Sequence, residues 1–172
     1  MNTFVLVFHP HLDQSQVNAR LAHAARDVEG VTVRDMYALY PDFKINVVEE
    51  QRLLEQADRI VLQFPMYWYS TPALLKQWED DVLAYGWAYG STGTALHGKE
   101  LLIAASAGAP AESYTAEGKY GHSVEEVLTP LEITSSFIGT RYMKPFIITG
   151  ALTVERENLD EYAHRYTDVL KA

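Results

Sequence analysis

The chain's most informative segment is FPMYWYSTP, residues 64–72, which directly follows a strand-like apolar run. It places three successive aromatic residues where a strand should end, an arrangement that a packed core rarely needs. A proline near each end restricts the backbone and the preceding residues to extended conformations. We therefore expect a rigid loop that offers backbone N–H groups and aromatic faces to a flat ligand. The ring of a redox cofactor meets that description.

The composition limits the class of protein. A length of 172 residues with 48% hydrophobic content predicts one domain, residues 1–172, with a substantial core. The net charge of -9 disfavours nucleic acid as a partner. The absence of cysteine excludes disulfides, thiolate metal sites and cysteine nucleophiles, so redox chemistry would need a bound organic cofactor. No third ligand lies near His9 and His11, so no metal site is expected. Without a charged leader or a spanning apolar run, the protein is expected to be cytoplasmic.

Short apolar runs alternate with helical patterns along the chain. The strand-like runs are Thr3–Phe8, Val31–Arg34, Arg59–Phe64, Glu100–Ala105 and Phe146–Thr149. The helical patterns are Val17–Val28, Glu49–Ala57, Pro72–Tyr85, Ser123–Ser135 and Glu155–Leu170. Strands that alternate with helices predict an α/β fold, in which a doubly wound parallel sheet of five strands has helices on both faces.

The topology predicts where a ligand site lies. In doubly wound sheets, ligands bind beyond the carboxyl ends of the strands, where the strand order reverses. For the order 2-1-3-4-5, this point lies between the first and third strands, which exit at His9-Pro10 and Pro65–Tyr69. The fourth strand is adjacent and exits at Ser106–Pro110. Three loops of unusual composition are therefore expected to converge at one edge of the sheet.

Each of these loops suits a ligand, although each has a second interpretation. The first loop leads into a helix whose free N–H groups and dipole favour a phosphate, and His9, Ser15 and Asn18 add donors. Its alternative is ordinary capping by Ser15 beside a surface histidine. The aromatic loop could equally serve internal packing or a subunit interface. The small residues Ser106–Gly108 would let the backbone approach a ligand, but a tight turn uses the same residues.

A series of motifs in fixed order resembles the NAD(P)H:quinone oxidoreductase family. This flavodoxin-like group includes general stress protein 14-type reductases and the ancillary protein of glutathione-regulated potassium efflux. The motifs cover nearly the whole chain and are His9-Pro10, Ser15-x-x-Asn18, Asp35-Met36-Tyr37, Pro41-Asp42-Phe43, Ala57-Asp58, Phe64–Pro72, Leu75-Lys76-x-Trp78, Gly98-Lys99 and Gly108. The resemblance implies a flavodoxin-like sheet of order 2-1-3-4-5. The Ser/Thr-x-Thr-Gly-type phosphate loop of true flavodoxins is missing, and His9-Pro10 stands in its place.

The resemblance also implies roles for individual residues. The flavin phosphate would be held by His9, Ser15, Gln16, Val17 and Asn18. The isoalloxazine ring would meet Pro65, Met66, Tyr67, Trp68 and Tyr69, and the N–H groups of Ser106, Ala107 and Gly108 would approach its N1/O2 side. Tyr114 matches the family's active-site tyrosine and would also contact the flavin. Tyr120 stands where mammalian relatives often have histidine, with His122 two residues on. Tyr114, Tyr120 and His122 are thus the candidate catalytic residues, although a tyrosine is a poorer acid than imidazolium at neutral pH.

The function implied by the resemblance is flavin-dependent NAD(P)H:quinone oxidoreduction. In a two-electron ping-pong sequence, NAD(P)H would give hydride to the flavin and leave, and a quinone-like acceptor would take it in the same place. No Gly-x-Gly-x-x-Gly motif opens a helix, so NAD(P)H is not expected to have a Rossmann site of its own. Two alternatives stay open. The protein could be a flavin-binding regulatory subunit of a potassium-efflux transporter in the membrane, or a flavodoxin-type electron carrier.

Two further expectations concern the cofactor and the assembly. FMN is expected rather than FAD, because the chain is short and has no C-terminal extension to cover an adenosine. The family likeness implies a homodimer. The aromatic residues Trp78, Tyr85, Trp87 and Tyr89 would then either pack inside the subunit or form an interface that walls the flavin pocket. The choice between NADH and NADPH and the physiological acceptor stay open.

Overall fold

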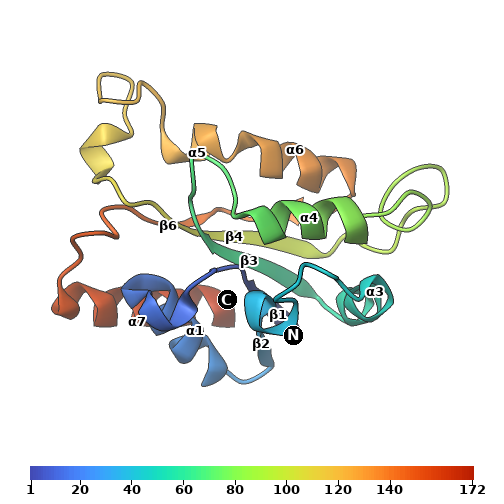
Figure 1. Cartoon of the computed structure of the whole chain (residues 1–172). Coiled ribbons are helices and arrows are strands. Elements are labelled where there is room, and N and C mark those ends of the chain that lie inside the picture. Colours follow the sequence, from blue (N-terminus) through green and yellow to red (C-terminus); the bar gives the residue numbers. More distant parts are fainter.

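The computed structural model describes all 172 residues and shows a parallel sheet between two layers of helices (Figure 1). The strands are β1 (Thr3–Val7), β2 (Val31–Asp35), β3 (Arg59–Pro65), β4 (Glu100–Ser106), β5 (Arg141–Tyr142) and β6 (Phe146–Ile148). Their order is β2-β1-β3-β4, with β5 and β6 both paired to the outer edge of β4. The predicted order is therefore confirmed, with its fifth strand divided in two.

The division of the fifth strand follows from a proline. β5 pairs with the beginning of β4, and β6 pairs with its end. Pro145 lies between them and has no N–H to donate to the ladder, so regular pairing stops there and resumes at Phe146. The sequence predicts β6 but not β5, because two residues carry no recognisable strand pattern.

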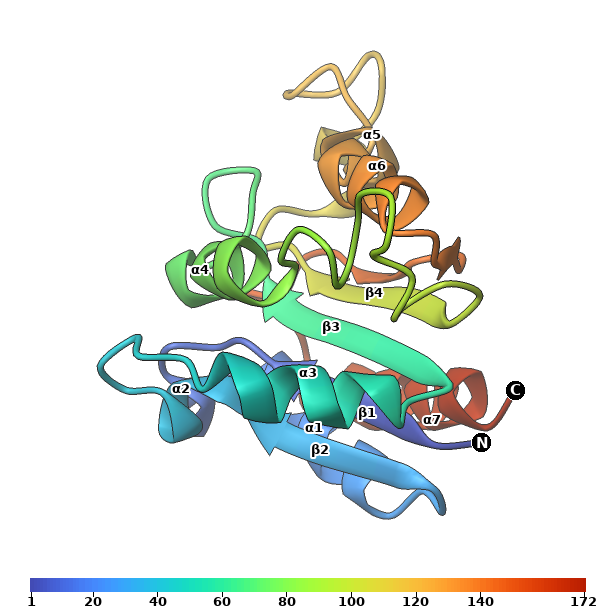
Figure 2. The same ribbon diagram turned by 90° about the vertical axis from the view of Figure 1, so that its right-hand side faces the viewer.

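The helices form two layers on opposite faces of the sheet (Figure 2). Their bounds are α1 (Gln16–Arg26), α2 (Met36–Leu39), α3 (Val47–Glu55), α4 (Ala73–Val82), α5 (Val124–Val127), α6 (Thr129–Phe137) and α7 (Arg156–Lys171), with 3₁₀ turns at Leu12–Gln14 and Ala111–Ser113. α1 and α7 cover one apolar face of the strands, and α3, α4 and α6 cover the other. The predicted helix Ser123–Ser135 is instead two helices that meet at Leu128.

The sheet register places the loops that the sequence singles out. Val7 of β1 lies opposite Gln63 of β3, and Pro65 of β3 lies opposite Ser106 of β4. The three strands therefore end at nearly the same level. Their exits lie side by side at one edge of the sheet, as the topology predicts.

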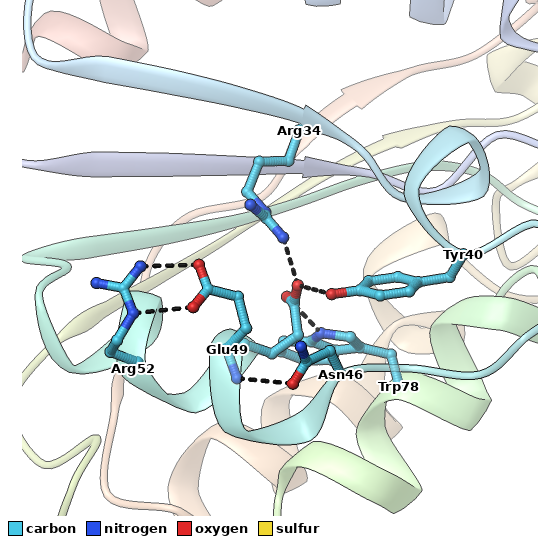
Figure 3. A network of polar contacts seen from close by, with 7 residues as sticks. Arg34, Tyr40, Asn46, Glu49, Arg52 and Trp78 are labelled. Atoms are coloured by element: carbon cyan, nitrogen blue, oxygen red, sulfur yellow. Dashed lines mark hydrogen bonds and ion pairs between the residues drawn. The ribbon is translucent and has the colours of Figure 1, made fainter.

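A charged cluster is buried under α3 on one face of the sheet (Figure 3). Glu50 is 1% exposed and accepts hydrogen bonds from Arg34 at 2.5 Å, the Tyr40 hydroxyl at 2.6 Å and the Trp78 indole at 3.1 Å. Burial, and then the bond to Glu50, raise the pKa of Tyr40 to about 12. These four residues, the Glu50 cluster, come from β2, the α2–α3 loop, α3 and α4, so the carboxylate ties these elements together.

Candidate functional site

A pocket of about 530 Å³ lies at the strand exits, within the range of about 300–1,000 Å³ that holds small organic ligands. It is lined by ten of the predicted residues, namely His9, Ser15, Gln16, Val17, Asn18, Pro65, Met66, Tyr67, Ser106 and Gly108. No lining residue carries a carboxylate, although the chain contains 23 Asp and Glu residues. The pocket is therefore suited to an anionic ligand rather than a cation.

The first turn of α1 forms one end of this pocket. Ser15 has an extended backbone, and its Oγ caps the helix by accepting a hydrogen bond from Asn18 N at 3.0 Å. The N–H groups of Gln16 and Val17 have no acceptor in the chain. Free N–H groups at the positive end of a helix dipole bind phosphates and other anions. Capping and anion binding are thus compatible here, because the cap uses only one N–H group.

His9 adds a neutral donor to the same end. Its Nδ1 accepts a hydrogen bond from the backbone N–H of His11 at 3.1 Å, which leaves the ring proton on Nε2. Burial, and then the nearby His11, lower the pKa of His9. The imidazole is therefore uncharged at neutral pH and offers an N–H group to the pocket without the desolvation cost of a buried cation.

The loop after β4 contributes less backbone than the sequence predicts. The N–H of Ala107 donates to Ile148 O at 2.8 Å, and the side chain is 1% exposed. Ala107 therefore presents no N–H to a ligand, because pairing with the β6 segment continues past the end of β4. Ser106 contributes its hydroxyl, and Gly108 contributes a free N–H. A Cβ at Gly108 would lie 2.9 Å from Leu152 Cδ1, so glycine fits that close approach.

The aromatic loop reverses direction at its tip. Tyr67 and Ser70 exchange two backbone hydrogen bonds of 3.1 and 3.0 Å, and the φ angles of Trp68 and Tyr69 are 50° and 59°. Two positive φ angles are the pattern of a type I′ hairpin turn, which normally uses Asn or Gly. Bulky residues in this region carry about 1–3 kcal/mol of strain each. The prolines restrict only themselves and the residues just before them, so they do not determine the conformation of this tip.

The consequence of this turn is an exposed aromatic tip. The side chain of Trp68 is 91% exposed, and the N–H groups of Trp68 and Tyr69 have no acceptor in the chain. Neither residue lines the pocket, whereas Pro65, Met66 and Tyr67 do. Strain of this kind at a strand exit points to a function for the tip, since packing does not require it.

Two of the three candidate catalytic residues form a tyrosine cluster with the aromatic loop. The ring of Tyr120 lies 5.2 Å from that of Tyr69 and 4.9 Å from that of Tyr114. Burial raises the pKa of Tyr114, and the neighbouring hydroxyls of Tyr120 and Tyr69 raise it further. Burial and Tyr120 likewise raise the pKa of Tyr69. These hydroxyls stay protonated at neutral pH, so they can donate hydrogen bonds but cannot act as bases.

His122 is not brought to this cluster. Its side chain is 69% exposed, and its Nδ1 lies 3.6 Å from a Glu126 carboxylate oxygen. The adjacent Ser123 and Glu126 form the capping box of α5, which holds this segment at the start of the helix. The sequence places His122 close to Tyr120 along the chain, but the turn at Gly121 separates their side chains.

The pocket also contains residues that the sequence analysis omits. His11 and Gln14 line it beside the first turn of α1, and Ala151 and Leu152 line it from the segment after β6. The sequence does contain a signal for Ala151 and Leu152, because the predicted fifth strand ends at the same edge of the sheet as the other three strands and these residues follow it.

A second cleft separates α4 from α6 and opens beside the aromatic loop. It has a volume of about 310 Å³ and is lined mainly by apolar side chains, including Leu83, Leu131 and Ile138. Glu79 lies in it without any hydrogen-bond donor, and burial raises the pKa of Glu79 to about 7. On the adjacent surface, Ile133 and Phe137 of α6 are exposed.

No helix of the chain combines the length and apolarity needed to cross a membrane.

Comparison with known proteins identifies the family. A family model described as "Flavodoxin-like fold" matches residues 1–170. The Bacillus subtilis NAD(P)H oxidoreductase YrkL is 49% identical over 172 residues, covering 100% of this chain and 99% of its own length. General stress protein 14 from Treponema denticola, in complex with FMN, is 42% identical with a TM-score of 0.95, covering 99% of this chain and 98% of its own. An NADPH-quinone reductase from P. pentosaceus is 32% identical with a TM-score of 0.89, and the match covers 98% of this chain and 97% of the reductase. The chain therefore belongs to the flavodoxin-like family of these oxidoreductases, as its motifs predict.

Proposed function

We propose that this protein binds FMN in the 530 Å³ pocket and catalyses the reduction of quinone-like acceptors by NAD(P)H. The observation that carries the proposal is the donor set of the pocket. The N–H groups of Gln16, Val17 and Gly108 and the Nε2–H of His9 are all free of acceptors in the chain, and no carboxylate lines the pocket. A ligand with a phosphate and several carbonyl oxygens matches this set. The FMN complex of the Treponema denticola relative supports the same choice.

The residues present fit FMN at both ends of the pocket. The first turn of α1 and His9 would hold the phosphate, and Ser106 and Gly108 would donate to polar atoms of the ring system. Pro65, Met66 and Tyr67 would form the wall beside the ring. When bound, FMN supplies the two-electron carrier that a chain without cysteine lacks.

The catalytic role of the protein is orientation and hydrogen bonding. Tyr114 presents a protonated hydroxyl beside the aromatic loop, with the ring of Tyr120 against it, where a quinone-like acceptor would develop negative charge on oxygen during reduction. A single position for both substrates, with NAD(P)H leaving before the acceptor enters, gives a two-electron ping-pong sequence. Support for this acceptor class comes from the likeness to an NADPH-quinone reductase.

The test is direct and starts with the purified protein. The visible spectrum and the mass of the released ligand should identify FMN, and NAD(P)H oxidation should depend on added quinone. Initial rates at several quinone concentrations should give parallel double-reciprocal lines. Absence of a bound or bindable flavin would contradict the proposal. FMN binding with no quinone-dependent oxidation would favour the regulatory-subunit alternative instead.

We further propose that two copies of the chain associate through the surface around the second cleft. The supporting observation is a group of exposed apolar side chains near that cleft and the aromatic loop, including Trp68, Tyr85, Ile133 and Phe137. Exposed aromatic residues of this number are typical of interfaces rather than of free surface. Analytical ultracentrifugation should find a dimer, and the double substitution Ile133→Ser with Phe137→Ser should shift it to the monomer.

A further inference from the structure

A buried chain of neutral side chains connects α7 to the floor of the pocket. The Tyr166 hydroxyl donates to Gln63 Oε1 at 3.1 Å, and Gln63 Nε2 donates to the backbone oxygen of Asn18 at 2.9 Å. Asn18 Nδ2 then donates to Ser106 Oγ at 2.8 Å. These four residues, the Gln63 network, are at most 5% exposed, yet Asn18 and Ser106 line the pocket. Gln63 and Tyr166 do not reach it.

The donor and acceptor roles within the network are set by a main-chain oxygen. The carbonyl of Asn18 can only accept, so the amide of Gln63 must turn its Nε2 toward it and its Oε1 toward Tyr166. Burial raises the pKa of Tyr166 far above its ordinary value, so its hydroxyl keeps the proton that it donates. The orientation of the Gln63 amide is therefore determined by the Asn18 carbonyl, and the protonated Tyr166 hydroxyl donates to the amide oxygen that this orientation presents.

The same logic continues from Gln63 to Ser106. Gln63 Nε2 also lies 3.5 Å from Asn18 Oδ1, so the amide oxygen of Asn18 faces Gln63 and its nitrogen faces Ser106. The Ser106 hydroxyl is thereby an acceptor toward Asn18, and its own hydrogen has no acceptor within the chain. That hydrogen is left for a ligand in the pocket.

We infer that Gln63 and Tyr166 are positioning residues that fix the Asn18 amide and thereby aim the Ser106 hydroxyl at the bound cofactor. This inference rests on the proposed FMN site, which it deepens. It assigns a binding role to two residues outside the pocket, one of them on the last helix of the chain. Without Gln63, the Asn18 amide can turn over, and Ser106 would then donate to Asn18 Oδ1 instead of to the ligand.

A double-mutant cycle on FMN affinity tests this coupling. Gln63→Leu keeps the side-chain size and removes both ends of the amide, so we expect the Kd of FMN to rise about tenfold, the equivalent of one lost hydrogen bond. In the Ser106→Ala background, the same substitution should change the Kd less than about twofold, because the group through which it acts is gone. A merely structural role would give equal losses in both backgrounds.

Two further variants keep the test decisive. Tyr166→Phe removes one hydroxyl from the network and should weaken FMN binding about threefold, again only when Ser106 is present. Tyr162→Phe is the matched control, because Tyr162 lies on the same helix and its hydroxyl has no hydrogen bond, so the Kd should not change. If Gln63→Leu does not fold, the Tyr166→Phe cycle decides the question alone.

The outcomes separate this inference from the proposed function. If the unaltered chain binds no FMN, both are overturned. If it binds FMN and the losses are additive with Ser106→Ala, or if Tyr166→Phe has no effect, only the inference is overturned. Non-additive losses in a folded protein, checked by Tm and circular dichroism, would support it.

Discussion

The two buried polar groups on opposite faces of the sheet differ in charge and in where they end. The Glu50 cluster is charged, and all of its hydrogen bonds to the carboxylate come from within the protein. The Gln63 network is neutral, and its last hydroxyl has a hydrogen left for a ligand. The Glu50 cluster connects the edge strand β2 to α3 and α4, whereas the Gln63 network connects the central strand β3 to α7. A closed cluster, whose carboxylate accepts only from the protein, can contribute only to stability and shape. An open network, whose last hydroxyl keeps a hydrogen for a ligand, can also set the affinity of the pocket for that ligand.

Loss of the Glu50 carboxylate should give the largest effect. Glu50→Ala leaves the partly buried Arg34 and the Tyr40 and Trp78 donors without their acceptor, and removal of one partner from a buried ion pair costs about 3–5 kcal/mol. The free energy of unfolding, measured with urea, should fall by that amount. Glu49→Ala is the matched control on the same helix, because the Glu49–Arg52 pair is exposed and should contribute little to stability. A loss below 1 kcal/mol for Glu50→Ala would contradict the closed-cluster interpretation.

Tyrosine hydroxyls allow a matched comparison of the two groups. Tyr40→Phe removes a donor to the buried carboxylate and should lower the unfolding free energy by about 1.5–3 kcal/mol, because hydrogen bonds to charged groups are the stronger ones. Tyr166→Phe removes a neutral bond and should cost about 1 kcal/mol. Only the second variant should also change FMN affinity. An FMN effect in Tyr40→Phe equal to that in Tyr166→Phe would remove the distinction between the two groups.

The fold can be predicted well from the sequence because the spacing of apolar residues reflects which side chains are buried. Each main strand except β5 and each long helix has a pattern of its own, and parallel pairing then places the loops at one edge. β5 is missed because two residues next to Pro145 are too short to show a period. The division of the predicted Ser123–Ser135 helix is missed because the apolar pattern runs through Pro130, whereas this proline lies in the first turn of a new helix, α6.

The site is predicted less completely, because residue type does not reveal how a group is oriented. Ala107 is a suitable small residue, but the pairing of its N–H with Ile148 depends on where β6 ends. His122 is a suitable acid, but the start of α5 turns it toward Glu126. Gln63 and Glu50 lie in apolar surroundings with no local motif, so their partners come from distant parts of the chain.

Like the Gln63 network, the tyrosine cluster has a hydroxyl group that can donate to a ligand, and it allows a test of catalysis. Tyr114→Phe removes a protonated hydroxyl from the acceptor side of the proposed site, so quinone turnover should fall about tenfold while FMN stays bound. Stopped-flow measurement of both half-reactions would locate the effect in oxidation by quinone. Tyr37→Phe serves as a control, because its hydroxyl accepts from Leu74 N at 3.3 Å and its ring packs on Phe43 rather than on the tyrosine cluster. An unchanged turnover would remove Tyr114 from the mechanism.

Glu79 gives the sharpest contrast with Glu50. Both are carboxylates in largely apolar surroundings, but Glu50 has three donors and Glu79 has none. In sequence, Glu79-Asp80-Asp81 reads as a solvated helix face, whereas Glu79 lies in the cleft between α4 and α6. Its pKa of about 7 exceeds that of an exposed glutamate, about 4.3. Between pH 4.3 and pH 7, the folded state therefore holds a proton that the unfolded state has released.

The sign of the resulting pH dependence follows from this proton. The stabilising contribution is complete below pH 4.3 and is lost as the pH rises through 7, because the folded state must then carry a charge in an apolar cleft. The full shift would correspond to about 4 kcal/mol, and the partial access of water to the cleft reduces the expected loss to about 1–2 kcal/mol. Glu79→Gln should remove this dependence, so the variant should be more stable than the parent at pH 8 and nearly equal to it at pH 4.5. Parallel stability profiles for parent and variant between pH 4.5 and pH 8 would show that Glu79 is ionised throughout, and its cleft would then be wetter than its lining indicates.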